Sequence, residues 1–196
     1  MTGTRGAYRK TAQRREQILD AAFTLFAKNG YTASSVNEIA RMVGISQTGV
    51  LHHFAGGKLA LLTAVLQQRD ALAEENLRGK TGRDFLATLV EISRIQATQR
   101  GVVQLYRNLS TEAVDPEHPA HEYFRDRLSR IADAVTQAFT EVLEQDGLTP
   151  GTEPREASLS TLAMTEGLEA LWLQGMDVDM AEGIRLFING YLTRAL

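Results

Sequence analysis

Hydrophobic residues recur along most of the chain at intervals of three and four, whereas strict alternation with polar residues is confined to short stretches. Residues at these intervals share one face of a helix, so each segment gains an apolar stripe. The pattern predicts an all-α protein of about nine helices, over residues 11–28, 35–42, 47–53, 58–79, 82–99, 102–109, 119–145, 154–174 and 179–194. Residues 147–153, which include Pro150 and Gly151, are expected to form a loop.

Residues 34–54 carry the most informative spacing, because two short helical patterns there flank a glycine corner. Gly44 stands where the first helix must end, and a left-handed conformation costs glycine little. Ser46 can cap the second helix, since its hydroxyl can accept from the free amides of the first turn. The inward residues are Val36, Ile39, Ala40 and Val43 in the first helix and Val50 in the second. The segment predicts a helix-turn-helix, a motif that places its second helix in the major groove of DNA.

An ordinary helical hairpin with a solvated polar face would show the same spacing, and the distribution of charge separates the two interpretations. Residues 1–60 contain 8 Lys or Arg and 3 Asp or Glu, whereas residues 61–196 contain 13 and 21. The basic residues lie on both sides of the motif, at Arg5, Arg9, Lys10, Arg14, Arg15 and Lys58. Positive charge is therefore expected where a phosphate backbone would run, and residues 1–10 predict a basic arm rather than a solvated tail.

The outward edge of the second helix supplies the candidate DNA-contacting residues. They begin with the cap and continue along the helix as Ser46, Gln47, Thr48, Gly49, Leu51 and His52. This mostly polar edge suits a major groove. Gly49 costs a helix about 1 kcal/mol relative to alanine, and its missing side chain would let the backbone come close to DNA.

The stretch from residue 18 to residue 66 resembles the DNA-binding domain of TetR-family transcriptional regulators. It contains AAxxLFxxxGY, an IAxxxGxS run, an HF pair and a following lysine, in that order. The resemblance implies that Ser34 and Ser35 replace the threonines that begin the second helix and touch phosphate. It also implies that His53 lies near phosphate, that Phe54 belongs to the small core, and that Lys58 contacts phosphate from the start of the fourth helix.

Two residues depart from the family pattern. Leu51 stands where the family often has a tyrosine, so a phenol contact to phosphate is replaced by a side chain that could touch a thymine methyl or cover the groove wall. Gly49 is unusual inside a recognition helix. Docking on DNA is therefore better specified by the sequence than the choice of bases.

The C-terminal part resembles the family in its helical layout, with a looser similarity to BetI-type regulators in LAMTEGLEALWL. The resemblance implies a DNA-binding domain over 1–57 and an effector-binding and dimerisation domain over 58–196. Small residues at Ala163, Gly167 and Ala170, with the bulky Leu186, Phe187 and Tyr191, could form a dimer interface between the last two helices or pack within one chain. A dimer would place two recognition helices about 34–36 Å apart, as a near-palindromic operator requires.

Ligand-contacting residues are harder to identify from the pattern. Tyr106, Phe124 and Trp172 lie on helices that the resemblance places around a ligand pocket, but aromatic residues at helical spacing more often belong to a core. Glu166 lies in an apolar stretch, where a carboxylate needs a partner. It could orient a ligand or pair with an arginine.

Other classes of protein are disfavoured. His118 and His121, with Glu117 and Glu122, could suggest a metal site, but Pro119 disrupts their geometry and favours a helix-start surface. No catalytic triad, phosphate loop or metal-ligand motif is present, so neither an enzyme nor a cofactor is expected. The chain has no cysteine, no signal-like h-region and no run near the roughly 18 apolar residues of a membrane helix, which predicts a soluble protein of the reducing cytoplasm.

These observations favour a homodimeric repressor that a small molecule of unknown identity releases from its operator. Linkage requires the molecule to bind better to a form whose recognition helices are wrongly spaced, and the fourth helix would carry that coupling. An activator or a regulator without an effector is the first alternative. A helical assembly module that never touches DNA is the second.

Overall fold

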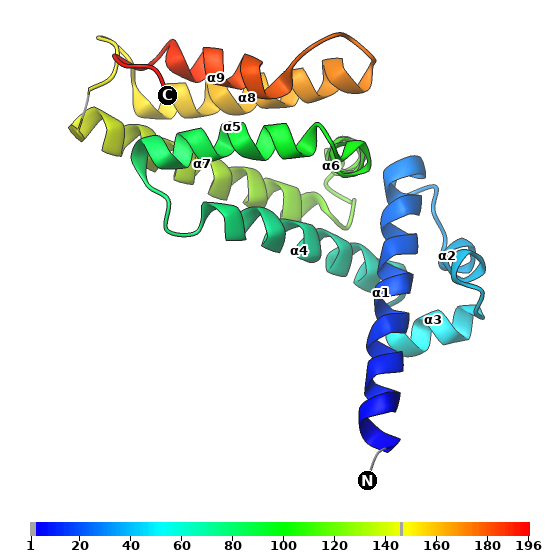
Figure 1. The fold of residues 1–196 in the computed structure, drawn as a ribbon. Helices are drawn as coiled ribbons and strands as arrows, with labels where there is room; N and C mark the ends of the chain where they lie inside the picture. Colours follow the sequence, from blue (N-terminus) through cyan, green and yellow to red (C-terminus); the bar gives the residue numbers. More distant parts are fainter. Residues whose placement is uncertain (1–2, 146) are drawn as a thin grey trace. The chain divides into compact units, whose positions relative to one another are not determined.

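The computed structural model describes residues 3–145 and 147–196, which contain nine helices and no strand (Figure 1). The helices are α1 (Gly3–Asn29), α2 (Val36–Val43), α3 (Gln47–His53), α4 (Gly57–Leu77), α5 (Gly82–Gln96), α6 (Arg100–Glu112), α7 (His121–Gln145), α8 (Pro154–Leu173) and α9 (Met180–Asn189). One isolated bridge joins Leu148 to Leu192. The predicted all-α fold with an N-terminal helix-turn-helix is confirmed.

Several helix ends differ from the sequence prediction; for example, α5 ends at Gln96 rather than near residue 99, and α6 ends at Glu112 rather than near residue 109. α1 begins at Gly3 rather than near residue 11, so the expected basic arm is helical from that residue onward. α7 begins at His121 rather than at Pro119, because the Ala120 N–H donates to His118 Nδ1 and the His121 N–H to the His118 carbonyl, which keeps the segment a turn. α9 ends at Asn189 rather than near residue 194, and beyond its end the Thr149 N–H donates to the Tyr191 carbonyl at 2.9 Å.

The chain forms two compact units. The first comprises Met1–Ala71 and Gln104–His121, and the second comprises Leu72–Val103 and Glu122–Leu196. Two of the three boundaries fall inside α4 and α6, and the third follows the first residue of α7. This division is defined by contacts within each unit. The division expected at residue 57 separates a DNA-binding domain from an effector-binding domain, and it stays a prediction.

The first unit is built around the apolar stripe of α1. Ile18, Ala22 and Phe26 are completely buried, as the helical spacing predicted. The other helices of the unit contribute buried residues of their own, namely Ile39, Ala40, Val50, Phe54, Leu61, Leu62, Leu105 and Leu109. This core includes both helices of the helix-turn-helix, so it fixes the position of α3 within the unit.

The second unit has a larger core made by α5, α7, α8 and α9. Its buried members include Leu86, Val90, Val135, Phe139, Val142, Ala157, Ile184 and Ile188. α8 and α9 lie side by side (Figure 1), and they approach closely at Gly183, where a Cβ would lie 2.8 Å from Leu168 Cδ1. The α8 and α9 pair thereby keeps one face on this core and leaves another outside it.

Candidate DNA-binding surface

The corner of the helix-turn-helix is formed by caps at both ends of α2. The Ser35 hydroxyl accepts from the Glu38 N–H (3.2 Å) and donates to the Glu38 carboxylate (2.7 Å). This reciprocal arrangement resembles a capping box and satisfies a free amide of the first turn. At the other end Gly44 is left-handed (φ +71°), and the Ile45 N–H donates back to the Ala40 carbonyl. The predicted glycine corner is therefore present, while the role of Glu38 was not anticipated.

The second helix of the motif, α3, is capped as predicted. The Ser46 hydroxyl accepts from the Gly49 N–H at 3.1 Å, and Val50 is completely buried. A Cβ at Gly49 would lie 3.5 Å from Ile45 Cδ1 and from Ser46 Oγ, which is ordinary van der Waals contact. The fold of the chain itself therefore does not require glycine at this position.

The outward edge of α3 is accessible. Ser46, Gln47, Thr48, Leu51 and His52 are exposed, with Leu51 at 37%, while Gly49 and His53 are half-buried. The rings of His52 and His53 meet edge to face, with 5.5 Å between their centroids. The edge thus combines amide, hydroxyl and imidazole groups with one apolar side chain, a set that can contact base edges and thymine methyl groups.

The two serines before α2 have different environments. Ser34 is only 4% exposed, and its hydroxyl donates to the Gly30 carbonyl at 2.6 Å. Its predicted phosphate contact would require this hydrogen bond to break. Ser35 is half-buried at the N-terminus of α2, where the exposed amides of a helix favour an anion.

Two arginines that the sequence suggested for phosphate binding instead contact helix ends. Arg15 Nη1 donates to the His53 carbonyl at 2.7 Å, and its guanidinium lies 4.0 Å from the centroid of the Phe54 ring. Arg14 Nη1 donates to the Val43 carbonyl at 3.4 Å. Cations stabilise the C-terminal ends of helices, so these side chains brace α2 and α3 against α1.

Lys58 lies beside the turn between α1 and α2. Its ammonium group donates to the Thr32 carbonyl at 3.3 Å and lies 4.2 Å from the centroid of the Tyr31 ring. Burial lowers the pKa of Lys58, while the carboxylates of Glu112 and Glu38 act in the opposite direction and raise it. Burial also raises the pKa of the Tyr31 hydroxyl. The predicted phosphate-binding lysine is thus held against the protein, at the edge of the same unit as α3.

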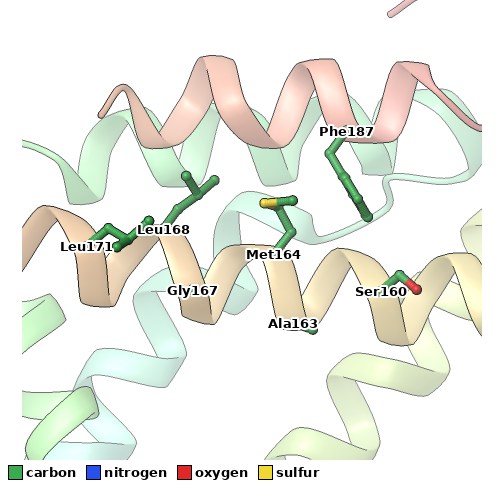
Figure 2. Close-up of a pocket in the computed structure, with 7 residues that line it drawn as sticks. All are labelled: Ser160, Ala163, Met164, Gly167, Leu168, Leu171 and Phe187. Carbon is green, nitrogen blue, oxygen red and sulfur yellow. The ribbon is translucent and has the colours of Figure 1, made fainter. Parts of the chain in front are cut away.

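Three of the six residues predicted for a dimer interface line an apolar hollow of about 420 Å³ on α8 and α9. It is lined by Ser160, Ala163, Met164, Gly167, Leu168, Leu171 and Phe187 (Figure 2). Ala163 and Gly167 are exposed, and nothing lies within 4 Å of a Cβ at Gly167. Ala170 is half-buried outside the lining, and the Tyr191 ring packs within the chain against Phe139 and Phe187.

The candidate ligand residues are not gathered in one described pocket. Tyr106 belongs to the first unit, where its hydroxyl donates to Asp70 Oδ1 at 2.7 Å. In the second unit Phe124 is 5% exposed, Glu166 already has an interaction partner, and Trp172 lies 5.3 Å from the Arg100 guanidinium. None of the four lines the hollow on α8 and α9.

The described residues lack the features of a metal site and of a single membrane-spanning helix. Within 3–145 and 147–196, no three His, Cys, Asp or Glu side chains converge as a metal site would need. His118 Nδ1 accepts from the Ala120 N–H, and His121 Nδ1 lies 2.8 Å from the Ala113 carbonyl oxygen. Over the same residues no single helix is long and apolar enough for a membrane span, and only α3 and α4 together, bent by 54°, reach those limits.

A capped α2, a left-handed corner and a capped α3 with an accessible polar edge define a helix-turn-helix protein of the DNA-binding class. Residues 18–65 match the family model for bacterial regulatory proteins of the tetR family. By this match the N-terminal part of the chain is similar to the DNA-binding domain of TetR-family transcriptional regulators.

Curated relatives agree with this assignment. The transcriptional repressor KstR2 of Rhodococcus jostii (strain RHA1) is 28% identical over 131 residues, which cover 67% of this chain and 57% of that repressor. The chain therefore matches little more than half of that relative's length. The transcriptional regulator BetI 2 of Chromohalobacter salexigens is 27% identical and covers 93% of this chain and 88% of its own.

Among solved structures, a complex of SmeT with triclosan has a TM-score of 0.73 at 15% identity, covering 90% of this chain and 88% of that one. SmeT is the repressor of a multidrug efflux pump of Stenotrophomonas maltophilia. At this identity the similarity establishes a shared fold.

Proposed function

We propose that this regulator is a homodimeric repressor that binds a near-palindromic operator in the cytoplasm and leaves it when a small molecule binds. The observation that carries the proposal is the accessible edge of α3, held by caps at a fixed place in its unit. Gln47, Thr48, Leu51 and His52 would contact base edges, and Ser46 and Gly49 would let the start of α3 approach the groove.

Phosphate contacts would surround this edge. The half-buried Ser35, His53 and Lys58 would meet the backbone near the N-termini of α2 and α4. The exposed Arg9 and Lys10 on the first turns of α1 would add positive charge, which attracts DNA without reading its sequence.

Dimerisation would use the apolar face of α8 and α9. A two-fold interface brings the same patch of both copies together, so small exposed residues such as Ala163 and Gly167 would let two α8 helices approach closely. Phe187 from the hollow and Leu186, which is 58% exposed, would add apolar area. Ala170 would lie at the margin of this interface, and Tyr191 would support Phe187 from within the chain.

The effector proposal is supported by the fold shared with SmeT, which has been solved with triclosan. Within the second unit Phe124, Glu166 and Trp172 remain the candidate contacts, together with Tyr106 on α6. The effector would act by binding better to a form whose two α3 helices do not match the operator, and DNA would then weaken effector binding by the same factor.

Selection of bound sequences from a random duplex library tests DNA binding directly. We expect a near-palindromic sequence whose affinity falls steeply as salt rises. Gln47→Ala should relax the preference at one base position by about 1–3 kcal/mol, whereas His53→Ala should weaken binding to all duplexes similarly. A failure to enrich any duplex would favour a helical assembly module that does not bind DNA.

Mode of action is tested with the enriched sequence placed upstream of a reporter gene. Repression that a compound relieves supports the proposal. Raised expression would assign an activator, and repression that no compound in a broad screen relieves would assign a regulator without an effector.

A further inference from the structure

α6 carries two polar side chains, one turn apart, of which one contacts the last turn of α1 and the other the turn that follows α1. Asn108 Nδ2 donates to the Ala27 carbonyl at 2.8 Å. Glu112 Oε2 accepts from the Tyr31 N–H at 2.8 Å and from the Thr32 N–H at 3.3 Å. Residues four apart lie on one face of a helix, so a single face of α6 hydrogen-bonds to the end of α1 and to the turn that follows it.

The geometry of the turn fits a carboxylate closely. Gly30 is left-handed (φ +77°), and a Cβ at this position would overlap Glu112 Oε1. His118 faces the same carboxylate with its Nε2 atom, 3.4 Å from Glu112 Oε2. Two backbone amides and an imidazole therefore face one carboxylate, so the position of Glu112 constrains this turn.

The same turn holds the lysine proposed to contact DNA. Lys58 donates to the Thr32 carbonyl and lies over the Tyr31 ring, so the Tyr31–Thr32 segment lies between Glu112 and Lys58. The turn also leads directly into α2. The Ser34 N–H donates to the Tyr31 carbonyl at 3.1 Å, immediately before the cap residue Ser35.

We propose that Glu112 is a positioning residue for DNA binding, which holds the Tyr31–Thr32 turn and thereby fixes Lys58 and the start of α2 for contact with the phosphate backbone. This inference rests on the proposed function, in which Lys58 meets phosphate. It assigns to α6 a direct role in the geometry of the DNA-binding surface, although Glu112 lies 81 residues from Tyr31 in sequence.

Two conservative variants separate position from charge. Glu112→Asp keeps the negative charge but is one methylene too short to hold both amides, whereas Glu112→Gln keeps the reach and loses the charge. We expect Glu112→Asp to weaken binding to a fluorescent random-sequence duplex about threefold to tenfold, a size typical of coupled neighbouring residues, and Glu112→Gln to retain most of the affinity. If Glu112→Asp binds like wild type while Glu112→Gln changes affinity, charge rather than position is responsible and the proposal is wrong.

A double-variant cycle with Lys58→Ala tests the route of the effect. The loss from Glu112→Asp should nearly vanish in the Lys58→Ala background, because the group that it positions is gone; an unchanged loss there would overturn the proposal. Amide hydrogen exchange at Tyr31 and Thr32 should accelerate in Glu112→Asp while the remaining amides of α1 stay protected. If amides throughout the protein exchange faster in Glu112→Asp, the weaker binding follows from a loss of folding stability, and this outcome would also overturn the proposal.

Glu141 provides a matched control in the second unit. Its carboxylate accepts from the Gly82 N–H at 2.6 Å, at another left-handed glycine (φ +45°). Glu141→Asp should therefore leave duplex affinity unchanged, and an equal loss of affinity in both Asp variants would contradict a specific role for Glu112.

If wild type binds no duplex, or Lys58→Ala binds like wild type, the proposed DNA contact fails. If Lys58→Ala weakens binding and Glu112→Asp does not, only the role of Glu112 fails.

Discussion

The two units of this regulator are stabilised in different ways. In the first unit α2 has 8 residues and α3 has 7, and side chains cap both helices. In the second unit α7 has 25 residues and α8 has 20, and neither α5 nor α8 has a side-chain hydrogen bond at its N-cap. Isolated helices shorter than about 12–15 residues are marginal in water, so the short pair depends on caps while the long helices depend on their shared core.

This difference explains why the DNA-binding surface can be precise. An edge proposed to read bases would need its side chains in fixed positions, and α3 is held by Ser46 at its start, Arg15 at its end and Val50 in the core. In the second unit Asp179 caps α9 and Arg100 donates to the Leu173 carbonyl at the end of α8, but the outer hollow on these two helices has an almost wholly apolar lining. The first surface is thus suited to polar recognition and the second to association by burial.

Removal of a core ring from the second unit should produce the largest effect. Phe139 is completely buried among apolar side chains, so Phe139→Ala should lower the free energy of unfolding by about 3–5 kcal/mol. Urea unfolding at a fixed protein concentration measures this loss. Leu143→Ala, on the same helix but at a position 47% exposed, should cost far less. A cost below about 1 kcal/mol for Phe139→Ala would contradict a body held together by apolar packing.

A pair of cap variants tests the contrast between the units directly. Ser46→Ala removes the hydroxyl that accepts from Gly49 and should cost about 1 kcal/mol of stability. Thr81→Ala, at the N-cap of α5, should change stability by less than about 0.5 kcal/mol, because Thr81 makes no such hydrogen bond there. Thermal unfolding of both variants provides the measurement. Equal costs would remove the distinction between capped and core-dependent helices.

Variants of two arginines on α1 should distinguish a side chain that stabilises the fold from one that attracts DNA. Arg15→Ala removes the hydrogen bond to His53 and the contact with the Phe54 ring, which should cost about 0.5–1 kcal/mol of stability. Arg9 is exposed, so Arg9→Ala should leave stability unchanged and reduce the salt dependence of duplex binding by about one phosphate contact. Unfolding curves and titrations at several salt concentrations measure both effects. Loss of stability in Arg9→Ala, or none in Arg15→Ala, would reverse these assignments.

The first unit was predictable from the sequence to the extent that its signals are local. The left-handed Gly44 and the capping Ser46 act within four residues of their partners, so spacing alone located the corner and both helices. Arg15 and Glu112 could not be assigned in this way, because their partners lie 38 and 81 residues away. A basic or acidic residue in a sequence does not reveal which distant carbonyl or amide it will meet.

The second unit shows the limit of helical spacing more clearly. Spacing identified apolar faces on its helices, but it does not say which neighbour each face meets. The spacing suggests Phe124 as a ligand contact, but its side chain is 5% exposed beside Tyr123; it suggests Tyr191 as a dimer contact, but the Tyr191 ring packs against Phe139. Ala163 and Gly167 were considered for a dimer and are exposed on α8, because small residues at helical spacing leave an accessible groove.

The two glycines of the motif should respond to alanine in opposite directions. Gly44 is left-handed, so Gly44→Ala should destabilise the protein by about 1 kcal/mol. Gly49 is helical and an added Cβ meets only ordinary contacts, so Gly49→Ala should stabilise by about 0.5–1 kcal/mol. The more stable variant should nevertheless bind its operator less tightly, because the methyl group occupies the space through which the α3 backbone approaches DNA. Stability gained together with unchanged or tighter operator binding would show that Gly49 is not part of the DNA contact.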